Sequence, residues 1–477
     1  MDRQYVVILH SNDIHSRLEN AAKIATYIEQ EREHHGSDRL LAIDIGDHMD
    51  RIRLETEGSD GKVNVALLNA AGYEAIALGN NEGLTYAREE LAEAYSDAKF
   101  AVIGANMPET YTGELPPWLV PNVIVEKNGI RIGLIAVTAR FTDFYSLLGW
   151  DLTDPLEAVR EQAEQLRGRV DVVAVMSHLG ITLDKRMAEE VDGIDLIMGA
   201  HTHHLLEEPL VIGGTTVCAA GKFGEHVGRV VVELMPGDKR PRFHVSCVPT
   251  AAFAEQAEAA AIIGGYREAG MRRLSRVIAR LEQPLPALAE RESPLGNMLA
   301  AGLRRHADAE IGIVNTGQLL GGLPEGDVTE GQLHALCPSP INPCRMKLTG
   351  KAIRTALEEA LLPEFTSKPI KGYGFRGEVL GSLAIDGMTI EYDPEKPPYE
   401  QLVSVLVGGE PLIDERDYVV GCIDMFTFHI GYLTLGEGRE IVYYLPEFIR
   451  DVIAAELTDS KAVEASRVEH WRMVSNK

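Results

Sequence analysis

The sequence predicts an α/β fold, in which a layered α/β domain is followed by a smaller α+β domain. Up to about residue 248, short apolar runs alternate with amphipathic stretches, a pattern typical of layered α/β architecture. Beyond Pro284 the texture changes to a helix, a strand, another helix and then β-rich segments. At roughly 150 residues per domain, the 477 residues allow two or three domains. We therefore expect two domains with ordinary hydrophobic cores.

Buried strands are predicted in the first domain because several apolar runs occupy consecutive positions, as strands covered on both faces do. Three further runs, at 210–217, 230–234 and 243–248, are spaced like an antiparallel meander. The earlier runs are Val6 to Leu9, Leu40 to Ile45, Ala75 to Leu78, Ala101 to Ile103, Ile132 to Val137, Val170 to Met176 and Ile194 to Met198.

A helical linker is predicted between the domains. Residues 251–281 are rich in Ala, Glu and Arg with helical spacing, and Pro284 follows them. The expected boundaries are 1–250 for the first domain, 251–283 for the linker and 284–477 for the second domain. In the second domain we expect a helix near 295–306 and a strand near 311–314, with charged helices closing the chain.

The charge balance argues against nucleic acid as a partner. The chain has 46 Lys+Arg and 72 Asp+Glu, a formal charge of −26, whereas binding to a phosphate backbone depends on Lys and Arg. An anionic ligand must therefore find positive charge locally. We expect no membrane span, because no run approaches the roughly 18 to 20 apolar residues required. The amino terminus lacks a signal-peptide pattern and the five cysteines are scattered, so we expect a cytoplasmic protein.

Histidines and carboxylates gather directly after the predicted strands. Eleven of the 15 histidines precede residue 245. Because ligands bind beyond the carboxyl ends of the strands in an α/β sheet, these segments are expected to converge. A single Asp-x-His or Ser-His is more often part of a turn or exposed to solvent, but five ligand-bearing strand ends in succession favour a metal site. They carry Asp13-Ile14-His15, Asp47-His48, Asn80, Ser177-His178 and His201-Thr202-His203-His204. The pair His34-His35, by contrast, ends a charged stretch and is expected to be solvated.

The donor set predicts two ions rather than one. Two carboxylates, one amide and up to four imidazoles exceed what one four-coordinate ion needs, but suit two ions that share a carboxylate. Mixed nitrogen and oxygen donors without thiolate favour Zn, Mn or Fe. Such a pair of ions would generate hydroxide from water and bind the oxygens of a phosphoryl group. Glycines before Asp47 and Asn80 fit tight turns that let the backbone approach an ion.

Five motifs resemble the metal-binding blocks of calcineurin-like metallophosphoesterases: His10-Ser11-Asn12-Asp13-Ile14-His15, Gly46-Asp47, Gly79-Asn80, Ser177-His178-Leu179-Gly180 and Gly199-Ala200-His201-Thr202-His203. The opening stretch 10–19 and the second domain narrow the resemblance to the two-domain 5′-nucleotidase family. Three later segments are similar to the carboxyl-terminal domain of that family, namely Gly326-Asp327-Val328-Thr329, Pro340-Ile341-Asn342 and Leu348-Thr349-Gly350-Lys351. The resemblance implies a catalytic domain of two sheets with flanking helices, and a phosphorylated small molecule, in particular a nucleotide, as substrate.

The resemblance also implies how the ligands divide between the ions. One ion would be bound by Asp13, His15 and Asp47, with His203 completing its shell. Asp47 would bridge to a second ion, bound also by Asn80, His178 and His201.

One departure from the family concerns its catalytic dyad. In the family the ligand Asn is followed by a His, and an Asp three residues later orients that His toward the reacting phosphate. Here these positions are Asn81 and Leu84. A positioned acid is typically worth about 10²- to 10⁴-fold in rate, so its loss should weaken the catalyst without abolishing it. Asn80 and Asn81 are expected to position phosphoryl oxygens, and His48 and Glu82 are candidate substitutes for the lost acid.

Substrate recognition is expected in the second domain, to which the family assigns two aromatic rings and several arginines. By resemblance Phe375 is the candidate for the first ring, Arg376 for an anion contact and Phe428 for the second ring. An aromatic residue in a β-rich segment is also commonly a core residue, and that alternative stays open.

The expected function is hydrolysis of phosphate esters or anhydrides by a metal-activated water, with nucleotides or UDP-sugars as substrates. The missing proton donor favours anhydrides, whose leaving group is already stable. The alternative is a catalytically weakened regulatory protein that binds metal and nucleotide. The sequence does not indicate an oligomeric state.

Overall fold

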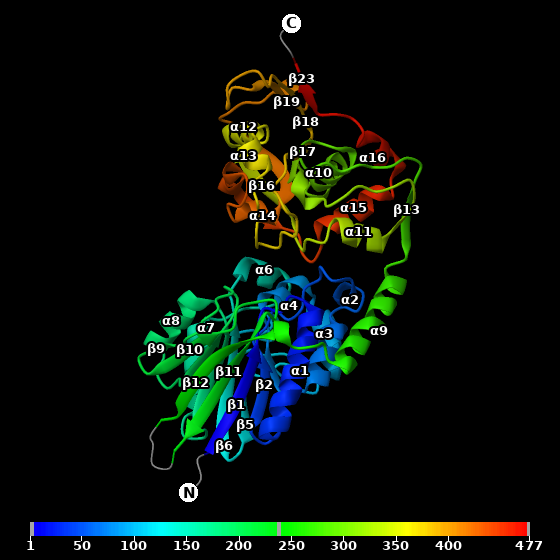
Figure 1. Cartoon of the computed structure of the whole chain (residues 1–477). Coiled ribbons are helices and arrows are strands. Elements are labelled where there is room, and N and C mark those ends of the chain that lie inside the picture. The colour runs from blue at the N-terminus through cyan, green and yellow to red at the C-terminus, as the bar shows by residue number, and fades with distance from the viewer. Residues whose placement is uncertain (1–3, 236–239, 475–477) are drawn as a thin grey trace. The chain divides into compact units, whose positions relative to one another are not determined.

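The structure is a computed structural model that describes residues 4–235 and 240–474 (Figure 1). The chain divides into two compact units, unit 1 (Met1–Met271) and unit 2 (Arg272–Lys477). Unit 1 has the layered α/β architecture that the alternation of apolar runs and amphipathic stretches predicts.

The first sheet of unit 1 has six strands in the order β12-β11-β1-β2-β3-β4. The neighbours from β1 to β4 run parallel to one another, whereas β11 and β12 are antiparallel additions at the other edge. The strands are β1 (Gln4–Ser11), β2 (Leu40–Asp44), β3 (Ala75–Ala77), β4 (Ala101–Ile103), β11 (His226–Leu234) and β12 (Arg242–Pro249).

The second sheet also has six strands, in the order β5-β6-β7-β8-β10-β9. Its central neighbours β6, β7, β8 and β10 are parallel. The predicted meander is divided between the two sheets, because β9 and β10 form a hairpin here while β11 and β12 pair in the first sheet. The strands are β5 (Asn122–Lys127), β6 (Ile130–Thr138), β7 (Val172–His178), β8 (Leu196–Gly199), β9 (Leu210–Ile212) and β10 (Thr215–Ala219).

Helices cover the outer face of each sheet, which gives four layers. Side chains of α1 and α3 lie in the core outside the first sheet, and those of α7 and α8 in the core outside the second. The helices of unit 1 are α1 (Leu18–His35), α2 (Leu54–Glu57), α3 (Lys62–Ala71), α4 (Asn80–Thr85), α5 (Arg88–Ala94), α6 (Thr142–Leu147), α7 (Pro155–Leu166), α8 (Ile181–Glu190) and α9 (Ala257–Arg273).

The period of two along β1 shows how the layers form. Val6 and Ile8 lie in the core between the two sheets, whereas Val7 and Leu9 lie in the core beneath the helices. Successive strand residues point to opposite faces, so an uninterrupted apolar run is needed when both faces are covered. Burying apolar surface on both faces holds the two sheets face to face and fixes their strand ends near one another.

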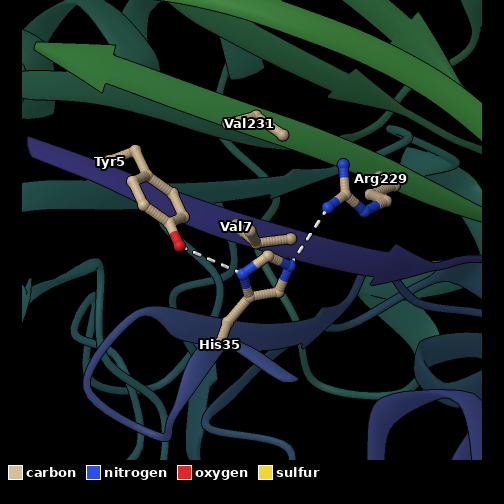
Figure 2. Close-up of a pocket in the computed structure, with 5 residues that line it drawn as sticks. All are labelled: Tyr5, Val7, His35, Arg229 and Val231. Carbon is tan, nitrogen blue, oxygen red and sulfur yellow. Dashed lines mark hydrogen bonds between the residues drawn. The ribbon is translucent and has the colours of Figure 1, made fainter. Parts of the chain in front are cut away.

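Of the pair His34-His35, expected to be solvated, His34 is exposed, whereas His35 is partly buried against the first sheet. Its ring helps to line a pocket of about 310 Å³ together with Tyr5, Val7, Arg229 and Val231. Figure 2 shows these five side chains. The side chain of His35 is 11% exposed. Nδ1 lies 3.2 Å from the Tyr5 hydroxyl, and Nε2 accepts a hydrogen bond from Arg229 Nη2 at 3.3 Å. Sequence alone could not place the end of α1 over β1 and β11.

Unit 2 contains a five-stranded sheet in the order β17-β14-β21-β16-β22, a four-stranded sheet in the order β20-β19-β18-β23, and the pair β13-β15. The strands are β13 (Val277–Leu281), β14 (Ile311–Asn315), β15 (Gly326–Thr329), β16 (Pro343–Thr349), β17 (Leu383–Asp386), β18 (Met388–Tyr392), β19 (Leu402–Val407), β20 (Glu410–Pro411), β21 (Asp417–Ile423), β22 (Arg439–Tyr443) and β23 (Trp471–Met473).

Helices pack on the main sheet of unit 2, with α10 buried against β14, β17 and β21. Two helices with charged faces come near the end of the chain, but β23 follows them. The helices are α10 (Pro294–His306), α11 (Glu330–Leu336), α12 (Gly350–Glu359), α13 (Pro363–Thr366), α14 (Asp424–Thr427), α15 (Ile449–Leu457) and α16 (Ser460–Ala465).

The predicted linker, 251–283, contains the end of a short 3₁₀ helix (Thr250–Ala252), the helix α9 and the strand β13. Helix α9 continues through Gly264 and Gly265, so a single helix forms there. Strand β13 pairs with β15 and is part of unit 2. Across 4–235 and 240–474, no helix is long and apolar enough to cross a membrane.

The core between the two sheets should dominate the stability of unit 1. Ile132 is fully buried there, and replacing it with Ala should destabilise unit 1 by about 2 to 5 kcal/mol because a cavity is left. The measurement is the thermal unfolding transition of the full chain by calorimetry. Val211, whose side chain is 69% exposed, provides the control, and Val211→Ala should change stability by no more than about 0.5 kcal/mol. Equal effects of the two substitutions would contradict this account of the core.

Candidate metal centre

The ends of five strands deliver the predicted ligands to one edge of unit 1. Asp13 and His15 follow β1, Asp47 follows β2 and Asn80 begins α4 directly after β3. His178 is the last residue of β7, and His201 and His203 follow β8. Because β1, β2 and β3 are parallel neighbours in one sheet, and β7 and β8 in the other, their carboxyl ends lie side by side.

Two overlapping groups of side chains could each hold a metal ion, and Asp13 belongs to both. The groups are Asp13 with His15 and His203, and Asp13 with Asp47 and His178. Within each group the ligand atoms all lie within 4.8 Å of one another. Asp13 Oδ1 lies 3.5 Å from His203 Nε2 and 4.0 Å from His178 Nε2.

Asp47, a member of the second group, also approaches a histidine of the first group. Its Oδ1 is 3.3 Å from His178 Nε2 and its Oδ2 is 3.8 Å from His15 Nε2. One oxygen of this carboxylate therefore faces each side, as a bridging ligand requires.

Two atoms of the site are buried without a hydrogen-bond partner among the described residues, namely Asn80 Oδ1 and His178 Nε2. The other ring nitrogen of His178, Nδ1, donates to the carbonyl oxygen of Ile45 at 2.7 Å. This bond orients the ring so that Nε2 points at the carboxylates, an arrangement common for metal-binding histidines. Leaving a polar atom buried and unpaired costs free energy, and a cation would remove that cost for both atoms.

His201 is tied to the same carboxylate through its backbone. Its N–H donates to both oxygens of Asp13, at 3.1 and 3.2 Å, and the centre of its ring lies 5.3 Å from that of His178. The structure thus brings six of the seven predicted ligands close together, and the seventh, Asn80, directly precedes Asn81, whose backbone N–H donates to Asp47.

The ligand loops have an unusual backbone. Asp13, His15, Asp47, His201 and His203 all have positive φ, between 46° and 71°. Non-glycine residues rarely adopt this left-handed region, and such strain clusters at functional sites. The surrounding contacts must therefore hold these loops in place.

Glu82 is one such contact. Its carboxylate accepts hydrogen bonds from the backbone N–H groups of Asp47, Met49 and Gly79, at 2.8 to 3.0 Å. Burial, together with the charge of Asp47, raises the pKa of Glu82 to about 7. In the structure Glu82 binds the loops after β2 and β3 together.

The two glycines of these loops allow the loops to touch each other. A Cβ on Gly79 would lie 2.1 Å from Asp47 Oδ1, and one on Gly46 would lie 2.5 Å from the backbone nitrogen of Gly79. The sequence pattern predicted that these glycines let the backbone approach an ion. In the structure they let the two loops, including the Asp47 carboxylate, approach each other.

Neighbouring charges counteract the effect of burial on the pKa values of Asp47 and His178. Burial alone would raise the pKa of Asp47, but the charges of His178 and His15 outweigh it, so the pKa falls well below its usual range. Burial alone would lower the pKa of His178, but Asp47 and Asp13 raise it to about 10. Burial, with the charge of His178, lowers the pKa of His201 to about 4.

The candidates for proton transfer occupy different surroundings. The backbone N–H of Asn81 donates to Asp47 Oδ1 at 2.8 Å, and its side-chain Nδ2 lies 2.9 Å from His15 Nδ1 and donates to the carbonyl of Met49. His48 is buried, and its Nδ1 lies 3.0 Å from Asn64 Nδ2. Burial lowers the pKa of His48 to about 3, so the ring is neutral at physiological pH.

Sequence reasoning did not single out two neighbours of His15. Asp50 Oδ2 lies 3.6 Å from His15 Nδ1, and the ring of Phe223 lies 5.7 Å from the His15 ring, centre to centre. Asp50 follows Asp47 by three residues and could have been suspected from that spacing, but no sequence signal brings Phe223 to this loop.

The predicted substrate residues lie in unit 2. Phe375 is 4% exposed and belongs to the hydrophobic core, whereas Tyr373 is 54% exposed. The Tyr373 ring faces that of Phe428, with centres 5.9 Å apart and planes inclined by 36°. The backbone N–H of Arg376 donates to Ser339 Oγ, and its Nη1 donates to the carbonyl of Phe375.

Comparison with known proteins identifies the family. The family model described as calcineurin-like phosphoesterase matches residues 6–205, and that described as the 5′-nucleotidase C-terminal domain matches residues 277–431. The chain is 37% identical to the uncharacterized metallophosphoesterase YunD of Bacillus subtilis, over 94% of this chain and 98% of the relative. The chain belongs to the 5′-nucleotidase family of metallophosphoesterases. The predicted family and fold class are confirmed.

More distant relatives agree. The 5′-nucleotidase of Rattus norvegicus is 24% identical, over 84% of this chain and 77% of its own. The solved NAD nucleotidase of Haemophilus influenzae aligns with a TM-score of 0.68 at 18% identity, covering all of both chains. The 5′-nucleotidase precursor of Thermus thermophilus gives 0.60 at 22% identity, over 99% of this chain and 100% of the other. At these identities the structures show the shared fold, and family membership makes the protein a metal-dependent phosphoesterase.

The protonation of His178 predicts how metal binding depends on pH. With the pKa raised to about 10, Nε2 carries a proton at neutral pH and must lose it to bind a cation. Apparent Mn²⁺ affinity should therefore rise with pH, by up to about tenfold per unit between about pH 7 and 9, and level off as the pH passes the raised pKa. Each binding event should release about one proton from this residue.

Titration calorimetry in buffers of different ionisation enthalpy counts the released protons. In His178→Gln the proton count should fall and the pH dependence should flatten. Affinity that is independent of pH over this window in the unsubstituted protein would contradict the assignment.

Proposed function

We propose that the protein hydrolyses phosphoanhydride bonds of nucleotides, with two divalent ions held by Asp13, His15, Asp47, Asn80, His178, His201 and His203. The observation that supports this most is the pair of buried, unpartnered atoms, Asn80 Oδ1 and His178 Nε2, beside two ionised carboxylates. A cation bound here would satisfy both atoms and offset the charge of the two carboxylates.

The donor chemistry fits divalent transition metals. Carboxylate, amide and imidazole donors without thiolate suit Mn, Zn or Fe. Asp13 and Asp47 each lie near histidines of both groups, so the chain offers a carboxylate for bridging. Divalent ions bound here would lower the pKa of water toward neutrality and neutralise charge on phosphoryl oxygens.

The residues of the chain set the geometry around the reacting group. The backbone N–H of Asn81 holds the Asp47 carboxylate, and the Nδ1–H of His178 is fixed on Ile45. Glu82 ties the loops after β2 and β3 together through three backbone hydrogen bonds. These bonds preorganise the site, which lowers the cost of reorganisation during reaction.

The absence of a proton donor at position 81 favours anhydrides. An amide donates hydrogen bonds but cannot deliver a proton to a leaving group. The neutral, buried His48 is a poor acid at physiological pH, and both carboxylate oxygens of Glu82 already accept backbone hydrogen bonds. A nucleoside alkoxide needs protonation to leave, whereas a phosphate in an anhydride leaves as a stable anion. Nucleoside diphosphates or UDP-sugars are therefore the proposed substrates.

In unit 2 we propose Tyr373 and Phe428 as the rings that stack with a nucleobase. Tyr373 is exposed and faces Phe428, while Phe375 is committed to the core. Arg376 remains a candidate anion contact because it lies three residues after Tyr373 in the same segment.

The alternative function is that of a catalytically weakened regulatory protein. The same absence of the His/Asp dyad, at Asn81 and Leu84, favours it. Retention of all seven ligand positions supports turnover. Replacing Asp47, the proposed bridging ligand, distinguishes the hydrolase from the regulatory protein. Turnover needs Asp47, whereas nucleotide binding in unit 2 does not.

We expect the Mn²⁺-loaded protein to hydrolyse ADP or a UDP-sugar at least about tenfold faster than AMP, judged by kcat/KM, because the alkoxide product lacks a proton donor. Released phosphate and nucleotide are measured by chromatography. Asp47→Asn should abolish turnover of every substrate. Faster hydrolysis of AMP than of both anhydrides would sink the proposal, and activity unaffected by Asp47→Asn would place the reaction elsewhere.

Restoring the dyad should shift this preference. Asn81→His combined with Leu84→Asp supplies an orientable acid, so AMP hydrolysis should rise by about tenfold or more while ADP hydrolysis changes less. The single Leu84→Asp variant is the matched control, since it adds the carboxylate without the acid. An unchanged AMP to ADP ratio in the double variant would count against a leaving-group basis for specificity.

A further inference from the structure

A short loop after β10 is fastened to the candidate metal centre. The backbone N–H of Phe223 donates to the carbonyl of Asp13 at 2.7 Å, and its own carbonyl accepts from Asn20 Nδ2 at 2.8 Å. Asn12 Nδ2 donates to the carbonyl of Gly221 at 2.7 Å. The loop 221–224 is therefore held on both sides by the segment that carries Asp13 and His15.

The loop holds the ring of Phe223 beside two ligand histidines. Its centre lies 5.7 Å from the His15 ring and 6.4 Å from the His203 ring. Phe223 has φ of +59°, which a bulky residue rarely adopts. Contacts with the ligand segment must offset that strain, so the position of the ring is strongly determined.

Two cations approach this ring. Arg17 Cζ lies 4.9 Å from its centre and Lys222 Nζ lies 4.6 Å from its centre. A cation over an aromatic face is attracted by the ring electrons, and the ring limits where each cation can go. Both positive charges are thereby kept near the candidate metal centre.

Neither Arg17 nor Lys222 forms an ion pair or a side-chain hydrogen bond within 4–235 and 240–474. Nearby arginines behave differently, since Arg53 pairs with Glu19 at 2.6 Å and Arg229 with Glu31 at 2.8 Å. In a chain with a formal charge of −26, two unpaired cations beside a cluster of ligands provide the local positive charge that an anionic substrate needs.

We propose that Arg17 and Lys222 bind the second phosphoryl group of a substrate whose first phosphoryl group lies at the candidate metal centre. The proposal rests on the proposed function and names its substrate class, which is compounds with two or more linked phosphates. A guanidinium can bind phosphate oxygens through two parallel hydrogen bonds, and an ammonium adds a point charge.

The same two cations would assist the reaction that lacks a proton donor. Water adds to the first phosphorus, the bond from that phosphorus to the bridging oxygen breaks, and the second phosphate leaves with the electron pair while the proton of the water passes to solvent. The charge gained by the leaving phosphate falls next to Arg17 and Lys222, which offset it without donating a proton.

Direct binding tests this proposal independently of turnover. The Mn²⁺-loaded full chain is titrated by calorimetry with methylenediphosphonate, which has two linked phosphoryl groups, and with methylphosphonate, which has one. Arg17→Gln and Lys222→Gln should each weaken binding of the diphosphonate by about tenfold. Binding of the monophosphonate should change by less than about twofold.

Two further variants act as controls. Lys222→Arg keeps the charge and should retain diphosphonate binding. Lys185→Gln removes an exposed lysine from α8 and should leave diphosphonate binding unchanged. This variant controls for the loss of one positive charge from the chain. Thermal unfolding of each variant confirms that the fold is intact.

The outcomes separate this proposal from the proposed function. Equal losses for the two phosphonates, or a loss as large in Lys185→Gln, would overturn the role of Arg17 and Lys222. A selective loss of diphosphonate affinity in a protein that nevertheless prefers AMP to ADP would support the two cations and reject the anhydride preference. A preference for ADP that survives both substitutions, with diphosphonate binding unchanged, would support the anhydride preference and reject the role of Arg17 and Lys222.

Discussion

The structure of unit 1 depends on placing two buried carboxylates, Asp13 and Asp47, within reach of the same imidazole. Two negative charges in a buried site are costly unless positive charge accompanies them. In the absence of metal the raised pKa of His178 keeps its ring protonated and supplies that charge. Divalent ions supply it in the loaded state. The left-handed backbone of the ligand loops and the hydrogen bonds of Glu82 both serve to keep these charges in place.

The fold meets this requirement by stacking two sheets whose parallel strands end on the same side. Each sheet alone carries part of the donor set, with Asp13, Asp47 and Asn80 from the first sheet and His178, His201 and His203 from the second. The apolar core between the sheets, which is continuous from Ile8 to Met176, therefore does more than stabilise the unit. It also fixes the distance between the candidate ligands of the first sheet and those of the second. The geometry of the charged site therefore depends on the packing of this core.

Much of this could be predicted from local sequence. Apolar runs marked the strands, and the residues that follow them marked the candidate ligands, since both signals depend only on neighbours along the chain. The positive φ of Asp13 and Asp47, the burial of His35 against the first sheet, and the choice of Tyr373 over Phe375 as the exposed ring were not predictable in this way. Each depends on which distant segment packs against the residue. The approach of Phe223 to His15 spans about two hundred positions and left no trace in the spacing of either segment.

The close contact between Gly46, Asp47 and Gly79 limits which substitutions this site can accept. Any side chain at position 79 would collide with the carboxylate of Asp47, so a substitution there would displace a candidate ligand. The side chains at positions 81, 84 and 222 are not part of this contact between the two loops. Substitutions there can change what the candidate metal centre acts on without disturbing the contact.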